Sequence, residues 1–386
     1  MISTLANQLR RRTTSGNWIP ELDGLRFIAI ASVILFHLHG QFLHHGNVTI
    51  APRYSTFALF VSNGNRGVPL FFMISGFILA RPFAEHHLFN KPRPVLSKYF
   101  ARRLTRLEPP YIVNLLFAAA ALIVIDHNTV RSILPHLAAS LVYLHTLIFH
   151  SPSTINSVAW SLEIEVQFYI LAPLLTLLFV IRNTAARRAA IVALMLAAAL
   201  LQIVLHWDVN TLPSYTLAGQ LQYFLGGLLF ADLFLTLFTH WKQDWRWDLV
   251  SLAGWPAVFL LPNTYIGIWL PFLAILLYIA AFRGVVVYRF LRNTWVAVIG
   301  GMCYTIYLWH PLVMTAASRI CSRIPFLNPP DYLALFVLQG IVKVAAVALV
   351  CLPFFLYLER PCMDPKWPSK LLNRIRPETK PSTLNT

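Results

Sequence analysis

Long apolar windows recur along the 386-residue chain from Leu25 onward, with polar or basic residues between them. Most approach the roughly 17–25 residues that an α-helix needs to cross a bilayer. In lipid the backbone must satisfy its own hydrogen bonds, which helices do within one segment. The pattern therefore predicts an all-α integral membrane protein. The eleven windows are 25–43, 67–80, 110–126, 133–149, 163–181, 189–206, 217–238, 249–262, 265–282, 295–315 and 333–358.

The composition excludes a water-soluble domain. Hydrophobic residues make up 57% of the chain and charged residues 12%, about half the usual charged share. Lys and Arg number 31 against 15 Asp and Glu, a formal charge of +16 that by itself would suggest a nucleic-acid partner. The position of the basic residues between apolar windows favours a topological role instead, so we expect a lipid bilayer and no nucleic acid as partner.

Basic loops predict the orientation, because Lys and Arg concentrate on the cytoplasmic side. The arm before residue 25, the 81–109 loop, the connections near 182–188, 242–246 and 283–292, and the tail after 360 are all basic. They share one side only if 133–149 is a re-entrant or interfacial segment. We therefore expect about ten transmembrane helices with N- and C-termini cytoplasmic. The expected regions are a basic arm at 1–20, a membrane domain at 21–362 and a disordered tail at 363–386.

Two other classes of site receive little support. Cys303, Cys321, Cys351 and Cys362 form no C-x-x-C pair, so neither a disulfide framework nor a zinc site is indicated. The histidines at 37, 39, 44 and 45 do not share one helix face, and we expect no metal. The polar first twenty residues indicate no cleavable signal peptide.

Ionisable side chains inside a bilayer are costly, so each is a functional candidate. Arg26 and His37 lie eleven residues apart, which on a helix is about 16 Å of rise on nearly the same face. The charge-derived topology puts Arg26 at the cytoplasmic mouth and His37 in the outer half. A snorkelling arginine and a histidine buried in a helix contact remain the structural alternative.

Two further spans carry polar side chains at the depth of His37. Glu163 and Glu165 open one span and face different ways, and Glu165 is the one expected to point inward. The span from 295 carries Tyr304 and His310. Three titratable groups at one depth, His37, Glu165 and His310, indicate proton transfer or a polar substrate. A first-turn position favoured by the helix dipole is the alternative for both glutamates, and an interfacial belt is the alternative for Trp160.

A basic run precedes the third window. Arg102, Arg103 and Arg106 lie directly before Pro109 and Pro110 at a membrane entry. Contact with inner-leaflet headgroups is one reading and a phosphate clamp is the other.

Taken together, these motifs resemble the acyltransferase 3 family of integral-membrane enzymes, which O-acylate glycans and other secreted molecules. The resemblance spans nearly the whole chain, with Cys303 where the family often has serine. It is carried by Leu22-Asp23-Gly24-Leu25-Arg26 with His37, Phe71-Phe72-Met73-Ile74-Ser75-Gly76-Phe77, Arg103-x-x-Arg106-x-x-Pro109-Pro110-Tyr111, Trp160-Ser161-Leu162-x-x-Glu165, Tyr304-x-x-Tyr307-Leu308-x-His310 and Glu359-Arg360-Pro361.

The resemblance implies a bacterial plasma-membrane enzyme that moves an acyl group, acetyl first, from cytoplasmic acyl-coenzyme A to a hydroxyl of a carbohydrate or cell-envelope acceptor. No cofactor is expected to stay bound. His37 would act as general base or transient acyl carrier. Glu165, the second catalytic residue, would orient a protonated ring or bind acceptor hydroxyls. Arg26, Arg103 and Arg106 would bind the donor.

Trp160, Tyr304 and His310 would line the acceptor side. A transporter or flippase of a polar or lipid-linked solute is the alternative function, and a structural or sensory protein is a third. The acceptor, the acyl length and the oligomeric state stay open.

Overall fold

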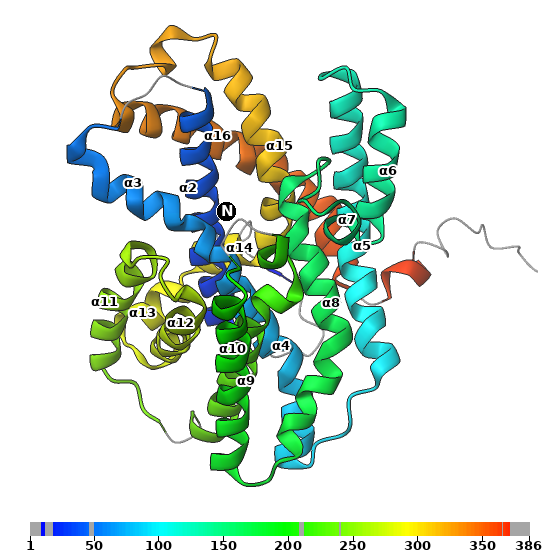
Figure 1. The fold of residues 1–386 in the computed structure, drawn as a ribbon, viewed down its shortest axis with the longest axis vertical. Coiled ribbons are helices and arrows are strands. Elements are labelled where there is room, and N and C mark those ends of the chain that lie inside the picture. The colour runs from blue at the N-terminus through cyan, green and yellow to red at the C-terminus, as the bar shows by residue number, and fades with distance from the viewer. Residues whose placement is uncertain are drawn as a thin grey trace, which may run out of the picture.

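The computed structural model describes residues 9–11, 18–45, 50–207, 212–238, 241–364 and 366–370, and in those ranges it contains helices and no strand (Figure 1). Most of the expected arm and of the tail after residue 370 lies outside the described residues. The longer helices are α2 (Pro20–His45), α4 (Gly67–Phe89), α5 (Leu96–Val124), α8 (Trp160–Leu175), α9 (Thr184–Val204), α10 (Leu217–Leu237), α11 (Arg246–Leu260), α12 (Ile266–Arg283), α15 (Cys303–Cys321) and α16 (Tyr332–Phe354). The shorter ones include α3 (Ser55–Ser62), η2 (Asn63–Arg66), α6 (Val130–Leu141), α7 (His145–Phe149), η4 (Thr176–Val180), α13 (Val286–Leu291), α14 (Thr294–Gly301), the π-helical η7 (Phe355–Glu359) and α17 (Arg360–Cys362).

Eight helical segments of the described chain are long and apolar enough to span a membrane, or nine if the bent pair α14 and α15 forms one span. The fold class is therefore an all-α integral membrane protein, with fewer candidate spans than the ten expected. The window at 249–262 corresponds to α11, whose 15 residues are too short. The window at 133–149 breaks into α6 and α7, and neither qualifies as a span.

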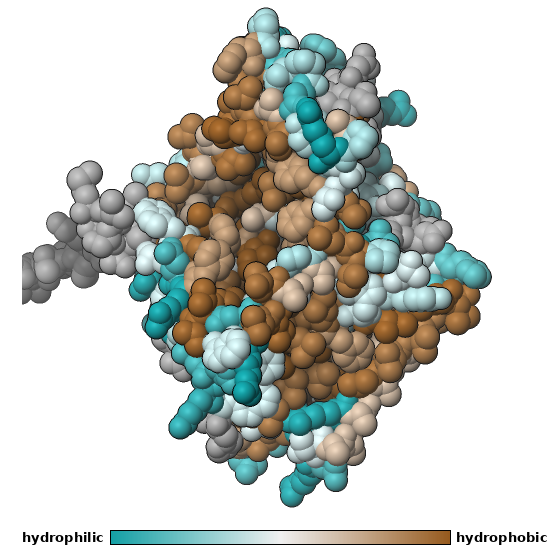
Figure 2. Space-filling model, turned by 90° about the vertical axis from the view of Figure 1, so that its left-hand side faces the viewer, coloured by the Kyte–Doolittle hydropathy of each residue, from teal (hydrophilic) through white to brown (hydrophobic). Residues whose placement is uncertain are grey.

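The outer surface supports this class. Large apolar side chains such as Leu252, Leu349 and Tyr357 are 73–82% exposed. Figure 2 shows hydrophobic residues covering much of one face, with hydrophilic residues gathered toward its margins. In water so large an apolar surface would drive association, whereas a bilayer accommodates it.

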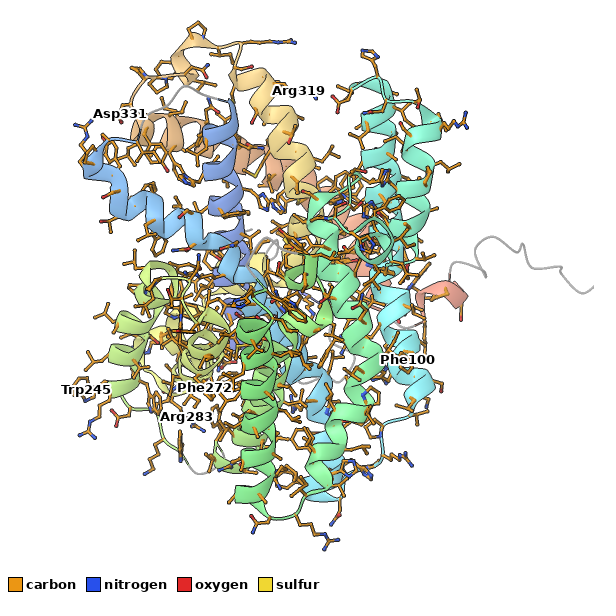
Figure 3. All side chains as sticks on the ribbon, in the orientation of Figure 1. Phe100, Trp245, Phe272, Arg283, Arg319 and Asp331 are labelled. Atoms are coloured by element: carbon orange, nitrogen blue, oxygen red, sulfur yellow. The ribbon has the colours of Figure 1, made fainter. Side chains whose placement is uncertain are left out.

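The helix ends separate the molecule into two poles. The α4–α5, α8–α9 and α10–α11 connections lie at the lower end of Figure 1, and the α5–α6 and α15–α16 connections lie at the upper end. Three of the basic loops thus share one end. The assignment of that end to the cytoplasm stays a prediction. Figure 3 shows Arg319 and Asp331 at the upper end and Trp245 and Arg283 in the lower half.

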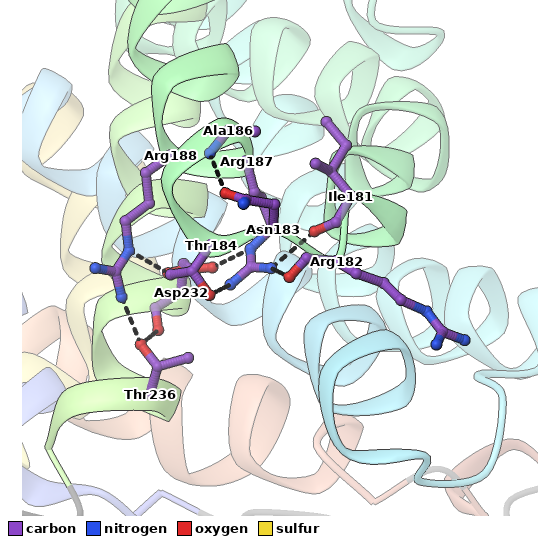
Figure 4. A network of polar contacts seen from close by, with 9 residues as sticks. All are labelled: Ile181, Arg182, Asn183, Thr184, Ala186, Arg187, Arg188, Asp232 and Thr236. Atoms are coloured by element: carbon purple, nitrogen blue, oxygen red, sulfur yellow. Dashed lines mark hydrogen bonds and ion pairs between the residues drawn. The ribbon is translucent and has the colours of Figure 1, made fainter.

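A buried ion cluster joins α9 to α10 near the lower end (Figure 4). The Asp232 carboxylate is fully buried and accepts from Arg187 and, at 2.7 Å, from Nε of Arg188. Arg187 also donates to the carbonyl of Ile181 at 2.8 Å. Two of the basic residues read from the sequence as topological signals therefore also hold helices together.

Glycine allows a close helix contact beside the site. At Gly227 of α10, a Cβ would lie 2.6 Å from the backbone nitrogen of Phe77 and 2.8 Å from Cα of Gly76 in α4. The missing side chain lets the two backbones touch, as small residues do between membrane helices. Phe224 stacks on Phe72 and on Phe168, with ring centroids 4.8 and 3.9 Å apart. This packing sets the position of α4, which carries Ser75 of the site.

Candidate active site

Arg26 and His37 lie on one uninterrupted helix, α2. Pro20 stands at its start, and the acidic Glu21 and Asp23 lie in its first turn, where the helix dipole favours negative charge. Arg26 and His37 line two different cavities of the same molecule. The eleven-residue spacing thus places one residue of α2 in each of two cavities.

We call the first the arginine cavity, a pocket of about 100 Å³ between α2, α4, α5, α8 and α15. Arg26, Arg103 and Arg106 all line it, together with Glu165. Three donor candidates from two helices are therefore brought together. The pocket residues are Arg26, Val68, Phe71, Phe72, Ser75, Ile78, Leu79, Arg103, Arg106, Leu107, Ser161, Leu162, Glu165, Tyr169, Cys303, Tyr304 and Tyr307.

Carboxylates hold two of these arginines, Arg26 and Arg106, in place. Asp23 is 2% exposed and accepts from Arg26, from Nη1 of Arg11 at 3.3 Å and from the Trp18 indole at 2.8 Å. Nη2 of Arg106 lies 3.7 Å from the buried Glu359. The guanidinium groups are thus oriented before any ligand arrives, which lowers the entropic cost of binding an anion.

Glu165 is oriented by α4. Its Oε1 accepts from the Ser75 hydroxyl at 2.7 Å. Ser75, in the second apolar window, therefore orients a site carboxylate. Tyr169, one turn after Glu165, lines the same cavity, and the Arg103 guanidinium lies 5.6 Å from its ring centroid. Glu163 faces another way, as expected, and its buried Oε2 accepts from the backbone N–H of Thr146 at the start of α7.

Tyr304 differs from its expected position. It lines the arginine cavity, not the one that contains Trp160, and its hydroxyl donates to the carbonyl of Leu107 at 2.8 Å. One helical turn separates Tyr304 from Tyr307, and α15 passes from one cavity to the other over that turn. Cys303 lines the arginine cavity as well.

We call the second the histidine cavity, which holds about 630 Å³ and contains His37 and Trp160. Apart from Arg66 and the histidines His37 and His206, its side chains are uncharged in the described residues. Amides and aromatic rings dominate it. They are Asn65, Gln202, Gln220, Gln222 and Asn263, with Phe36, Trp160, Trp207, Tyr215, Tyr223, Tyr265 and Tyr307. Such a surface suits a neutral polar ligand with apolar faces.

The two cavities share a wall. Val68 and Tyr307 line both of them. The Tyr307 hydroxyl accepts from Ser161 at 2.7 Å and donates to the carbonyl of Val158 at 3.3 Å, which fixes the ring between α15 and α8. A ligand in one cavity is therefore separated from the other cavity by a single layer of side chains.

His310 lines neither cavity. It is fully buried in α15, and its ring centroid lies 4.9 Å from that of His37. His310 was expected to line the acceptor side, and it does not line the cavity that contains Trp160. It was also expected at the depth of His37, and the two rings do lie side by side. Buried beside His37, it contacts that ring rather than the cavity.

Sequence reasoning missed several residues of the site. Asp23 lies three residues before Arg26, the spacing of a helical ion pair, and that signal was available. No comparable sequence spacing points to Ser75 or to the amides Gln202 and Gln222. The Gln202 amide donates to the Gln222 amide oxygen at 2.9 Å. Within the described ranges, no group of three or more His, Cys, Asp or Glu residues is placed to hold a metal ion.

Comparisons with known proteins agree with this picture. The fold and paired cavities define a helical membrane protein with a polar interior. The sequence model of the acyltransferase 3 family, described as an acyltransferase domain, matches residues 19–359, and the chain belongs to that family. No solved structure matches the chain significantly.

Two relatives from the curated proteins show what the chain is similar to. The peptidoglycan O-acetyltransferase OatA of Listeria monocytogenes is 24% identical over 91% of this chain and 57% of its own length. A Bacillus subtilis protein with the name "Putative peptidoglycan O-acetyltransferase YrhL" is 26% identical over 50% of this chain and 30% of its own length. The chain thus spans between about a third and just over half of these relatives.

Proposed function

We propose that the protein is a membrane O-acyltransferase that moves an acyl group, acetyl first, from acyl-coenzyme A to a hydroxyl of a carbohydrate in the bacterial cell envelope. The observation that carries this proposal is the pair of cavities on α2, one with three arginines and one with a histidine, separated by Tyr307 and Val68. The names of the relatives, both O-acetyltransferases, support the same class of reaction.

The arginine cavity is the donor side in this proposal. Coenzyme A carries phosphates on a nucleotide and ends in a narrow thioester arm. Arg26, Arg103 and Arg106 offer charge-assisted hydrogen bonds to such phosphates. In this proposal the narrow arm enters the cavity, and the nucleotide stays at its mouth, on the cytoplasmic side.

The histidine cavity is the acceptor side. Its amides can bond sugar hydroxyls, and its aromatic rings can stack on the apolar faces of sugar rings. The acceptor oxygen attacks the thioester carbon, so a C–O bond forms and the C–S bond breaks. His37 takes the hydroxyl proton as general base and passes it to the coenzyme A thiolate. Sequential kinetics are expected for this direct transfer, whereas an acyl-histidine intermediate would give ping-pong kinetics.

The test uses the purified chain in lipid nanodiscs with radiolabelled acetyl-coenzyme A and an extract of hydroxyl-bearing envelope glycans. Label should enter the glycan fraction as an alkali-labile ester, with release of free coenzyme A. His37→Gln should abolish transfer. His39→Gln is the matched control, because His39 lies on the same helix, hydrogen-bonded to Tyr332 at 2.8 Å, and lines neither cavity. It should keep transfer.

Arg103→Ala tests the donor side. Losing one charge-assisted bond costs about 1.5–3 kcal/mol, so the KM for acetyl-coenzyme A should rise about 10–100-fold. Solute uptake into vesicles without any acyl ester would instead favour the transporter. Full transfer by folded His37→Gln would contradict the proposal.

A further inference from the structure

The hydrogen position on His310 follows from the next residue. Pro311 has no N–H, so the carbonyl of Tyr307 lacks the donor that residue 311 would supply in an α-helix. Nδ1 of His310 lies 2.8 Å from this carbonyl oxygen and 3.1 Å from that of Ile306. A carbonyl oxygen only accepts, so Nδ1 carries the hydrogen. The His-Pro sequence thus selects one tautomer of the ring.

The other nitrogen of His310 is left as an acceptor without a donor. In the neutral ring with hydrogen on Nδ1, Nε2 has a free lone pair. This atom is buried and has no hydrogen-bond partner in the described residues. A buried polar atom without a partner costs about 1–3 kcal/mol, which is unusual unless the site uses it.

His37 is the side chain placed to supply that donor. The two rings lie 4.9 Å apart between centroids and are tilted by 59°. The Tyr307 ring is also near His310, at 5.8 Å, but its hydroxyl is already engaged with Ser161 and Val158. Hydrogen bonds between catalytic groups are often long without substrate and tighten when it binds.

We propose that His310 is a positioning residue whose Nε2 accepts the ring N–H of His37, so that the opposite nitrogen of His37 faces the acceptor hydroxyl in the histidine cavity. The inference rests on the proposed function of His37. When His37 takes the hydroxyl proton, its ring becomes cationic, and the neutral His310 holds the N–H that points away from substrate. The proton stays on His37 until it passes to the thiolate, and His310 gains and loses nothing.

A purely structural role for His310 would be to brace the proline-containing turn of α15. That role predicts a loss of folded protein, with equal activity in the molecules that fold. Positioning predicts a loss in kcat with donor binding unchanged. The two are separated by comparing His310→Phe, which removes the acceptor, with His310→Gln, which retains an acceptor oxygen.

The kinetic test uses these variants in nanodiscs after size-exclusion chromatography, with His39→Phe as the matched control. His310→Phe should lower kcat about 10–100-fold, the usual effect of losing a partner that orients a reactive side chain, and should leave the KM for acetyl-coenzyme A within about twofold. His310→Gln should recover most of that loss, because it retains an acceptor. His39→Phe should lower the melting temperature without lowering kcat. A folded His310→Phe with kcat within twofold of the parent, or a His310→Gln no better than His310→Phe, would overturn the inference.

A second measurement does not depend on turnover. In protein labelled with ¹⁵N-histidine, the signals lost in His310→Gln identify His310. They should report one protonated and one bare nitrogen, and Pro311→Ala, which restores a donor to the Tyr307 carbonyl, should change their ratio. Hydrogen on Nε2 in the parent would overturn the inference even if acyl transfer is confirmed. Failure of the proposed role of His37 would give a different result: His37→Gln would keep acyl transfer, and the His310 tautomer would be as inferred.

Discussion

Gly227→Ala tests the close contact between α10 and α4. The new methyl would lie 2.6–2.8 Å from the backbone of Phe77 and Gly76, where ordinary contact begins at 3.4 Å. The carbonyl oxygen of Met73 would lie closer still. Backbone cannot rotate away as a side chain can, so the helices must separate by more than roughly 0.7 Å. Overpacking of this kind costs about 1–3 kcal/mol. The better helix propensity of alanine returns about 0.5–1 kcal/mol, so we expect a net loss of up to about 2.5 kcal/mol.

Two glycines serve as matched controls. Gly226 is the neighbouring residue on α10, and the closest atom to a Cβ there would be the flexible end of Met73, at 3.2 Å. Gly40 lies on α2, and a Cβ added to it would have no other atom within 4 Å. Alanine at either site should leave stability unchanged or raise it slightly, through the same helix propensity.

The assay is thermal unfolding of the three variants in one mild detergent, followed by acetyl transfer at a temperature where all are folded. Gly227→Ala should melt several degrees below the parent. Its transfer rate should fall as well, because α4 carries Ser75, which orients Glu165. If the melting temperature of Gly227→Ala equals those of Gly226→Ala and Gly40→Ala, the close backbone contact between α4 and α10 does not restrict which side chain fits there.

Three further predictions concern buried or capping carboxylates. Asp23→Asn should raise the KM for acetyl-coenzyme A and lower the melting temperature, since removing one partner of a buried ion pair costs about 3–5 kcal/mol. Asp232→Asn should cost a similar amount through Arg187, with the donor KM unchanged, and an altered KM would count against a purely structural cluster. Asp248→Ala should cost about 1 kcal/mol at neutral pH, because its carboxylate accepts from the first backbone N–H groups around α13. Burial raises the pKa of Asp248, but these N–H groups lower it more, so its pKa lies below the usual range and the contribution to stability is lost as pH falls below about 4. Melting curves at neutral and acidic pH check this, and an equal deficit at both would contradict it.

The sequence by itself determined the class, the family and the helix that carries both reactive candidates. The length of an apolar segment is a local property of the sequence, and the thickness of the bilayer sets the length that is needed, so the all-α membrane fold followed from it. The spacing of Arg26 and His37 on α2 was equally local, since helix periodicity fixes which residues share a face. Three of the basic loops lie at one end, as expected from the concentration of Lys and Arg on one side of a membrane.

Only the tertiary structure decided which groups meet. Whether 249–262 was long enough to span depended on where the helices end. Tyr304 and Trp160 line different cavities, because α15 and α8 each contribute residues to both. Ser75 became the partner of Glu165, and Glu359 the partner of Arg106, across sequence distances that helix periodicity does not report. The contact of His310 with His37 joins two helices far apart in the chain, and such contacts depend on how side chains fill the space between helices rather than on any pattern within one.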